Sequence, residues 1–433
     1  MSTLMLPTMP RGKVGDKVDR RTAMAQHLGY RTLLRSMGPT FTTLAIVGRL
    51  PTSILPLALL LYAQSQLGSF ALAGLATAAL SLGGASGAVL IGHLSDTLGH
   101  RVVGVGTTLV QTVALIGFLL TCRPDAPLPA MLTCAALAGF ANPQLGAMAR
   151  ARWSQAAAVR DDRGPYTAAA MAWEGAVDEV SFVVGPVLAT TLAALAPAAP
   201  VLRAMGLAWV GLVGFALHRT ALPPARHGRA RHPDSPDRID WTLLVLLGVV
   251  TGAVGLLFGG SQTAIAAFFT LRGEQAVTGL VYGTMAVGSA SMGLLSNRLP
   301  ARFSLSDRIV VFGLGSALTA PLLVVAWDAA TMALACLIVG VMVGPTLVTA
   351  YALAERIAPP ERLSTVLTVL STVGVVGVAA GSAVAGQLIE AFSPQQAAWT
   401  ATLGGALATL AGLVVMRRVG GSGASGPRRG SQP

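Results

Sequence analysis

The strongest constraint on this chain is its succession of twelve long apolar segments. A helix needs about 20 apolar residues to cross the ~30 Å hydrocarbon core of a bilayer. The 433-residue chain is 53% hydrophobic and only 11% charged, whereas a soluble protein needs a charged exterior. The sequence therefore predicts an all-α membrane protein with twelve transmembrane helices. The predicted spans are residues 41–63, 70–94, 102–122, 129–149, 167–195, 201–218, 241–262, 276–297, 306–327, 331–353, 363–391 and 396–416.

The basic residues indicate how these spans are oriented. Of the 30 Lys and Arg residues, only Arg123, Arg203 and Arg272 fall in loops, or at the adjoining end of a span, on one side of the bilayer, and Arg49 falls within the first span. All the others lie in the alternate loops and the two tails or, as Arg308 does, at the adjoining end of a span. Because Lys and Arg favour cytoplasmic loops, we expect a multi-pass protein of the bacterial inner (plasma) membrane with both termini in the cytoplasm.

The longest internal polar connection, residues 219–240, is rich in Pro, Arg and Asp and divides the spans into six and six. Internal repeats of this kind are typical of secondary transporters. The expected organisation is a basic cytoplasmic tail (1–40), an N-terminal six-helix bundle (41–218), a cytoplasmic linker (219–240), a C-terminal six-helix bundle (241–416) and a flexible C-terminal tail (417–433).

The polar stretch between the second and third spans, residues 92–101, reads GHLSDTLGHR. It resembles G-x-L-[AS]-D-R-x-G-R-[KR], the signature of transporters of the major facilitator superfamily. The resemblance implies two six-helix bundles, alternating access and a central cavity lined by the first, fourth, seventh and tenth spans. The matching positions are Gly92, Leu94, Ser95, Asp96, Gly99 and Arg101, and the departures are Thr97 and His100.

The resemblance also implies a gating role for Asp96, whose counterpart in the family helps to latch the two bundles together. Two partners are open to it. One is the pair Arg150 and Arg152 at the end of the fourth span, and the other is the N-terminus of the eleventh span near Leu363, whose helix dipole favours an anion. The alternative is that Asp96 only caps the turn. Gly92, Leu94, Gly99 and Arg101 complete this candidate gating motif.

Three acids in the fifth span are unusual, because ionisable groups inside a membrane are costly. Glu174 and Asp178 are four residues apart and share a helix face, and Glu179 is turned about 100° from Asp178. Arg49 in the first span lies at a similar depth and is the expected partner. Three interpretations stay open: a structural ion pair, a proton-coupling site, or a later helix start that leaves the acids near the interface.

Polar side chains on the spans that the resemblance assigns to the cavity are candidate substrate contacts. The alternative is that they satisfy neighbouring backbone groups, which Ser and Thr commonly do in helices. Pro143, Pro345 and the pair Gly259-Gly260 predict breaks in the fourth, tenth and seventh spans. The candidate cavity residues are Asn142, Gln144, Gln262, Thr346, Thr349 and Tyr351.

These features favour a secondary active transporter that exports a small organic solute, with proton coupling as an open question. Uptake of a sugar or metabolite, and a non-transporting membrane sensor or scaffold, are the alternatives. We find no nucleotide-binding loop, no metal-ligand spacing and no nucleophile–base arrangement, so we expect no enzymatic activity and no cofactor. The expected partners are membrane lipids, the solute and protons, with no nucleic acid, for a protein that acts as a monomer.

Overall fold

The computed structural model describes residues 30–223, 240–300, 302–358 and 362–423. Its elements are helices, in keeping with an all-α membrane protein. Within these described residues, eleven helices are long and apolar enough to cross a membrane. Residues 1–29, 224–239 and 424–433 lie outside the described residues, and with them most of the expected N-terminal tail and linker.

The remaining predicted span, the fourth (residues 129–149), does not form one long helix, and we call it helix 4. It is divided into α7 (Leu128–Phe140) and α8 (Leu145–Ala158), which are too short to count separately as spans. The other elements of the first half are α3 (Pro39–Val47), α4 (Leu50–Leu67), α5 (Phe70–Leu98), α6 (His100–Thr121), α9 (Arg163–Leu195), α10 (Ala199–Leu207), the π-helical turn η1 (Ala208–Val213) and α11 (Gly214–Leu217).

The second half has longer continuous helices, and its last helix runs seven residues past the expected end of the bundle at residue 416. Its elements are α12 (Trp241–Thr270), η2 (Gln275–Val277), α13 (Thr278–Leu295), η3 (Ser296–Arg298), α14 (Leu305–Thr319), α15 (Leu322–Val325), α16 (Ala329–Ile357), α17 (Leu363–Ala391), α18 (Pro394–Ala397) and α19 (Trp399–Gly423).

Residues 30–37, expected to belong to a polar tail, form the short amphipathic helix α2 (Tyr30–Met37). Its apolar side chains Leu33 and Met37 are buried in the core of the first half. Ser36 Oγ also lies 2.7 Å from the hydroxyl of Tyr166 on α9. The apolar face of this helix therefore anchors the beginning of the described chain to the bundle.

The polar stretch 92–101 is more helical than expected. We expected the second span to end near residue 94, but α5 continues to Leu98 and α6 begins at His100. The reversal takes place at Gly99, whose φ of 83° is readily adopted only by glycine. Gly92 is an ordinary helical residue and takes no part in the turn.

Three helix irregularities of the first half lie close together. The first predicted span bends between α3 and α4 at Gly48 and Arg49, and the π-helical turn η1 packs against α3 there. Gly48 and Gly211 are in direct contact, so that a side chain at either position would collide with the backbone of the other segment. Next to them, Leu145 begins α8 after the break in helix 4. Irregular backbone at membrane depth is tolerated where it is buried in protein or lines a cavity.

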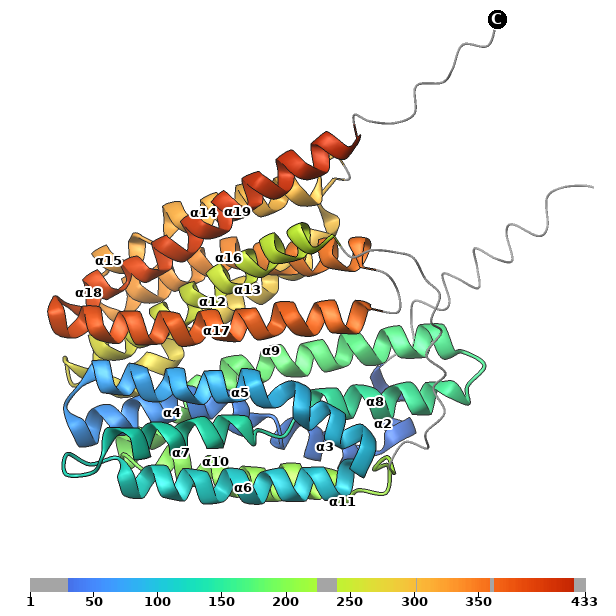
Figure 1. The fold of residues 1–433 in the computed structure, drawn as a ribbon, viewed down its shortest axis with the longest axis horizontal. Coiled ribbons are helices and arrows are strands. Elements are labelled where there is room, and N and C mark those ends of the chain that lie inside the picture. Colours follow the sequence, from blue (N-terminus) through green and yellow to red (C-terminus); the bar gives the residue numbers. More distant parts are fainter. Residues whose placement is uncertain (1–29, 224–239, 301, 359–361, 424–433) are drawn as a thin grey trace, which may run out of the picture.

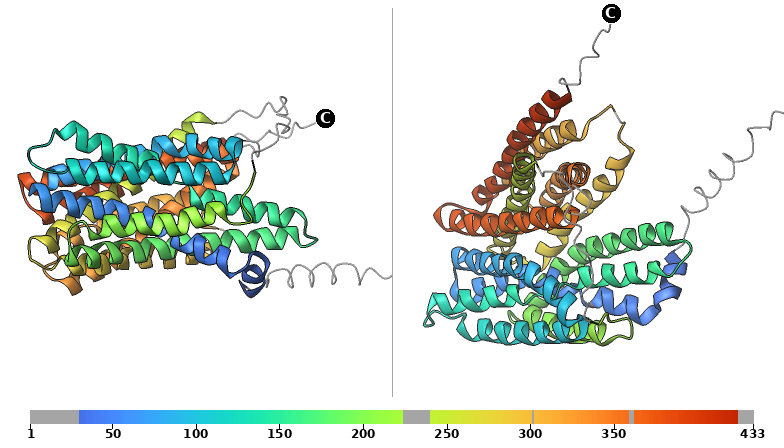
Figure 2. Two further views of the ribbon diagram at one scale, coloured as in Figure 1. Left: turned by 90° about the horizontal axis from the view of Figure 1, so that it is seen from below. Right: turned by 45° about the vertical axis from the view of Figure 1, so that its right-hand side comes forward.

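The two halves of the chain form two bundles, with α5 and α17 side by side at their boundary (Figures 1 and 2). We call the end with the loops after α5, α8, α13 and α16 the basic end, at the right of Figure 1, because Arg101, Arg160, Arg298 and Arg356 lie in or beside those loops. We call the other end the closed end.

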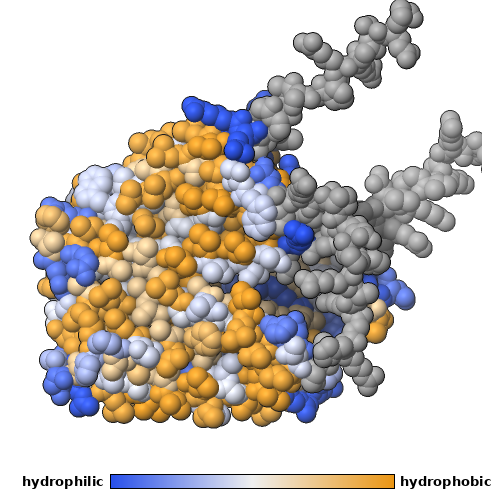
Figure 3. All heavy atoms as spheres, in the orientation of Figure 1, coloured by the Kyte–Doolittle hydropathy of each residue, from blue (hydrophilic) through white to orange (hydrophobic). Residues whose placement is uncertain are grey.

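The hydrophobic core differs between these two ends. Towards the closed end one core cluster includes residues of both bundles, such as Leu57, Phe70, Phe268 and Ala385. Towards the basic end each bundle has a separate core. Figure 3 shows hydrophilic residues recessed between the bundles at the basic end. The bundles are therefore packed together at the closed end and separated at the basic end.

Candidate functional site

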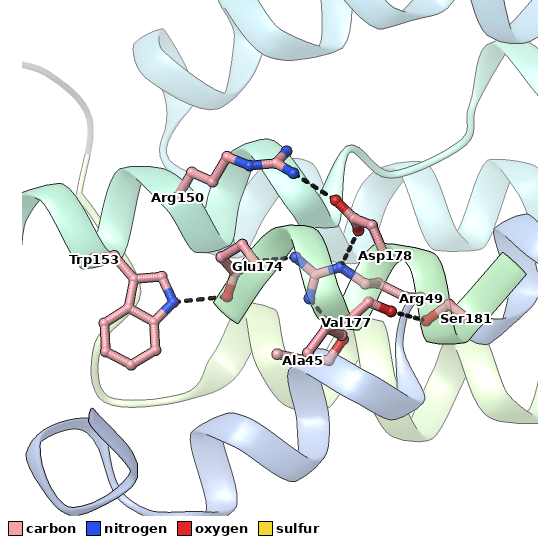
Figure 4. A network of polar contacts seen from close by, with 8 residues as sticks. All are labelled: Ala45, Arg49, Arg150, Trp153, Glu174, Val177, Asp178 and Ser181. Carbon is pink, nitrogen blue, oxygen red and sulfur yellow. Dashed lines mark hydrogen bonds and ion pairs between the residues drawn. The ribbon is translucent and has the colours of Figure 1, made fainter. Parts of the chain in front are cut away.

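Arg49 is the centre of a buried polar network in the first bundle (Figure 4). Its side chain is only 5% exposed, and it forms ion pairs with both Glu174 and Asp178 of α9. Arg49 Nε donates to Asp178 Oδ1 at 2.7 Å, and Arg49 Nη2 pairs with Glu174 Oε2. Arg49 Nη1 donates to the carbonyl of Ala45 at 3.1 Å. The structure thus brings together the two helices and three of the four charged residues that the sequence singled out.

Glu174 is fully buried, and both of its carboxylate oxygens have a partner. Oε1 accepts a hydrogen bond of 2.7 Å from the indole Nε1 of Trp153 on α8, while Oε2 faces Arg49. A buried carboxylate is tolerated when it is paired and hydrogen-bonded in this way. Trp153 was not recognised from the sequence as part of this site, because its role depends on the break that reorients α8.

Asp178 connects the buried part of the network to the surface. Its second oxygen, Oδ2, accepts a 2.5 Å hydrogen bond from Arg150 Nη2. Asp178 is 32% exposed and Arg150 is 43% exposed, whereas Glu174 is 0% exposed. The network therefore extends from the buried ion pair of Arg49 with Glu174 to the partly solvated ion pair of Arg150 with Asp178. Within this network Arg49 and Arg150 balance Glu174 and Asp178.

Glu179 lies outside this balanced set. Its side chain is exposed, and no hydrogen bond or ion pair joins it to another side chain in the described part of the chain. It is the sixteenth residue after Arg163, so it lies halfway along α9. An unpaired acid at such a position is expected to face water or a cavity.

The break in helix 4 brings two of the candidate cavity residues into contact. Thr52 Oγ1 on α4 donates to Asn142 Oδ1 at 3.1 Å, and Gln144 Nε2 donates to the carbonyl of Asn142 at 3.2 Å. Asn142 and Gln144 are both partly exposed. Pro143 lies between them in the segment without helical structure. The predicted break in the fourth span is thus present, and it exposes amide groups beside the Arg49 network.

The breaks that we expected in the seventh and tenth spans are absent, because α12 and α16 are continuous. Gly259 and Gly260 instead allow close packing, since a side chain on them would collide with Val378 and Thr400. Pro345 is accommodated inside α16 without a break.

The cavity residues predicted in the second bundle are mostly buried among neighbouring helices. Thr346 Oγ1 donates to the carbonyl of Met342 one turn earlier in its own helix, at 3.2 Å. Gln262, Thr346 and Thr349 are buried, and Tyr351 is half-buried beside Ser371 of α17. The structure does not bring them together with the Arg49 network.

Neither proposed basic partner of Asp96 is available to it. Arg150 pairs with Asp178, and Arg152 is 1% exposed with its Nε donating to His100 Nδ1 at 3.2 Å. Arg152 Nη1 also donates to the carbonyl of Phe215 at 2.7 Å, and its guanidinium stacks on the Phe215 ring. Among the described residues Asp96 is exposed and has no hydrogen bond or ion pair, including with the first turn of α17. Arg101 is likewise exposed.

At the closed end, polar contacts join the bundles directly. Glu390 of α17 accepts hydrogen bonds from Ser69 Oγ and, at 3.1 Å, from the backbone N–H of Ala71 in the first turn of α5. Thr190 of α9 donates to the carbonyl of Ala276 and accepts from the N–H of Gly279. Glu390 and Thr190 could not be recognised from the sequence, since an ordinary acid or threonine near a helix end suggests only a cap.

Comparison with known proteins identifies the architecture. Residues 41–239 match the family model described as Major Facilitator Superfamily. The chain is similar to the crystal structures of the nucleoside transporter NupG (TM-score 0.63, 14% identity, 88% of this chain and 98% of that one) and of the POT family transporter PepTSo (0.66, 12%, 90% and 99%).

A further similar structure is a bacterial homologue of the iron transporter ferroportin in an inward-facing state, with a TM-score of 0.65 and 16% identity over 89% of this chain and 98% of that one. No curated protein matches the sequence. At these identities the structural similarity establishes the fold. In the described part of the chain, no group of three His, Cys, Asp or Glu side chains could hold a metal ion.

Proposed function

We propose that this chain, a major facilitator superfamily protein by its fold and by the match of residues 41–239, is a secondary active transporter of a small organic solute that works by alternating access. The observation that carries the proposal is the unequal packing of the two ends. The bundles share one core at the closed end and have separate cores at the basic end. A rocking movement about the middle would close one end as it opens the other.

The basic end faces the cytoplasm in this proposal, because Lys and Arg are retained on that side. Both termini are then cytoplasmic, and the protein resides in the inner (plasma) membrane. The conformation described here is accordingly open to the inside. The solute would reach the broken part of helix 4 from the cytoplasm, where Thr52, Asn142 and Gln144 offer hydrogen-bonding groups beside the Arg49 network.

The charges at the site favour a hydrophobic or weakly polar solute. Arg49 and Arg150 are neutralised within the protein by Glu174 and Asp178, so they are not free to bind a multiply charged anion. Hydrophobic solutes cross bilayers without assistance, which makes active transport useful to the cell mainly as export. We therefore propose export as the direction.

The experiment is a flux assay on purified protein reconstituted into proteoliposomes. A panel of hydrophobic amines, neutral aromatic compounds, nucleosides and sugars is tested with and without a pH gradient, against liposomes that lack protein. We expect flux of at least one hydrophobic class that is accelerated by the gradient. No flux above the empty liposomes for any class would contradict transport. Flux of sugars or nucleosides alone would contradict the assigned solute class and direction.

A further inference from the structure

Glu179 lies on the face of α9 that contacts α13 of the other bundle. That contact is made by Val183, Pro186 and Thr190, which lie against Gly283 and Gly279 of α13 and Ala276 of η2 just before it. Glu179 precedes these three α9 residues by 4, 7 and 11 positions, spacings that keep side chains on one helix face. Glu179 is therefore the next residue of this contact face toward the basic end.

Burial along this face decreases toward the basic end. Thr190 and Pro186 are buried, Val183 is half-buried, and Glu179, Ala176 and Ala172 are exposed. The facing helix α13 follows the same trend, with Gly279 and Gly283 buried and with Val287 and Leu294 exposed on the same face. The two helices thus diverge near Val183, and Glu179 is the first side chain beyond that point.

Closing the basic end would bring the diverging parts of these faces together. The part of α13 that would meet Glu179 consists of Ala286, Val287, Ala290 and Leu294, and α13 contains no charged residue at all. An ionised carboxylate buried against such a surface would lose its hydration without gaining a counter-ion. A neutral carboxylic acid could be buried there at much lower cost.

The other elements packed against α9 offer no free counter-ion. α4 contains no charged residue, and η2 and α10 lie at the closed end. α2 carries Arg35 at the far basic end. α8 contributes Arg150, which is already paired with Asp178. Asp178 itself is held by two arginines and points about 100° away around the helix.

We propose that Glu179 makes closure of the basic end depend on protonation, and that closure takes up one proton at its carboxylate. In the open state described here the carboxylate is exposed and exchanges its proton with water on the basic side. Closure requires the neutral acid, and the proton returns to the basic side when that end reopens. The inference rests on the proposed alternating-access function and adds a proton-dependent step to it.

The test measures the distance between the bundles at the basic end as a function of pH. Spin labels are placed at Val159 and Arg302, exposed loop positions in different bundles. The background has alanine in place of Cys122, Cys134 and Cys336. The purified full-length protein is studied by pulsed electron spin resonance from about pH 5 to about pH 8.

We expect two populations, one with a short and one with a long distance between the labels. The ratio of the short-distance to the long-distance population should increase by up to about tenfold for each unit by which the pH falls, because closure takes up one proton. Glu179→Gln, which mimics the neutral acid, should favour the short distance at every pH. Glu179→Asp, which retains a titratable group, should restore the pH dependence. Glu355→Gln, which removes an exposed acid from the basic end of α16, should behave like the unchanged protein.

Two populations whose ratio does not depend on pH, or whose pH dependence survives in Glu179→Gln, would overturn the role of Glu179 while leaving alternating access intact. A ratio that does not depend on pH is also expected if Glu179 forms an ion pair with Arg150 on closure, because the carboxylate would then stay ionised and no proton would be taken up. A single distance at every pH would contradict both the proton-linked closure and the rocking movement. Proteoliposome flux would then decide separately whether the protein transports.

Discussion

Arg49 is held in place by the two carboxylates of Glu174 and Asp178, and its positive charge compensates a buried negative one. Because Glu174 is completely buried, removal of its arginine partner would leave an unpaired charge in a dry environment. Breaking one half of a buried ion pair typically costs about 3–5 kcal/mol. The contact itself was predictable from sequence, because Arg49, Glu174 and Asp178 lie at similar depths in their helices.

Arg49→Ala should therefore lower the unfolding free energy of the detergent-solubilised protein by about 3 kcal/mol. The double variant Arg49→Ala/Glu174→Ala should recover part of that loss, because no buried charge is left without a partner. Chemical unfolding followed by intrinsic tryptophan fluorescence would measure both. If the two substitutions were simply additive, the buried ion pair would not be the source of the effect.

Arg152 has a structural role that its position in the sequence did not reveal. The sequence suggested Asp96 as its partner, whereas its guanidinium bonds to His100 and the Phe215 carbonyl and stacks on the Phe215 ring. That pocket exists because η1 and the loop after α11 approach α8, which is a tertiary feature without a local sequence signal.

Arg152→Ala should reduce the unfolding free energy by about 2 kcal/mol, since it removes a large buried side chain and leaves a carbonyl without its donor. Arg150→Ala is the matched control on the same helix, because Arg150 is 43% exposed and Asp178 retains Arg49. We expect a clearly smaller loss for the control. Equal losses would mean that burial at Arg152 is not what matters.

At the scale of elements, the sequence located the helices well but not their breaks. Pro143 does interrupt helix 4, whereas Pro345 leaves α16 continuous and Gly259-Gly260 serve close packing. Proline and glycine permit a break, but neighbouring helices decide whether one forms. The bend at Gly48 and the π-helical turn η1 arise where two glycines meet, so neither was visible in one segment alone.

The close approach of α5 and α17 at the closed end depends on glycines as well. A side chain at Gly386 would collide with the backbone of Phe70 and Ala71. Gly386→Val should therefore open the closed end and shift the spin-label distance at the basic end toward the short, closed population. Gly106→Ala is the control, because no atom lies near a Cβ at that position in α6. A Gly386→Val protein with the unchanged distance distribution would argue against coupling between the two ends.

At the scale of the whole molecule, Asp96 has no partner in the conformation described here. If it latches the basic end when that end is closed, this is the state in which it should be free. Asp96→Asn should then slow transport severalfold without changing expression or the unfolding free energy, as measured by proteoliposome flux and chemical unfolding. Unchanged flux would leave Asp96 with a local role at the end of α5.

The unequal ends of the molecule could not be predicted from sequence, because both conformations of a rocking transporter satisfy the same hydrophobic pattern. The sequence predicted two bundles, from twelve apolar segments and the polar connection 219–240. It could not predict that Glu390 and Thr190 would join the bundles at one end only. Such contacts depend on the state of the molecule as much as on its fold.

The most direct test of alternating access is a reversible lock at the closed end. Thr190 Oγ1 lies 3.3 Å from the carbonyl oxygen of Ala276, which is exposed, so Thr190→Cys and Ala276→Cys in a background without native cysteines would allow a disulfide between α9 and η2. We predict that oxidation abolishes flux of the solute in proteoliposomes, that a reductant restores it, and that either single variant transports under both conditions. Flux that continues in the oxidised double variant would contradict alternating access.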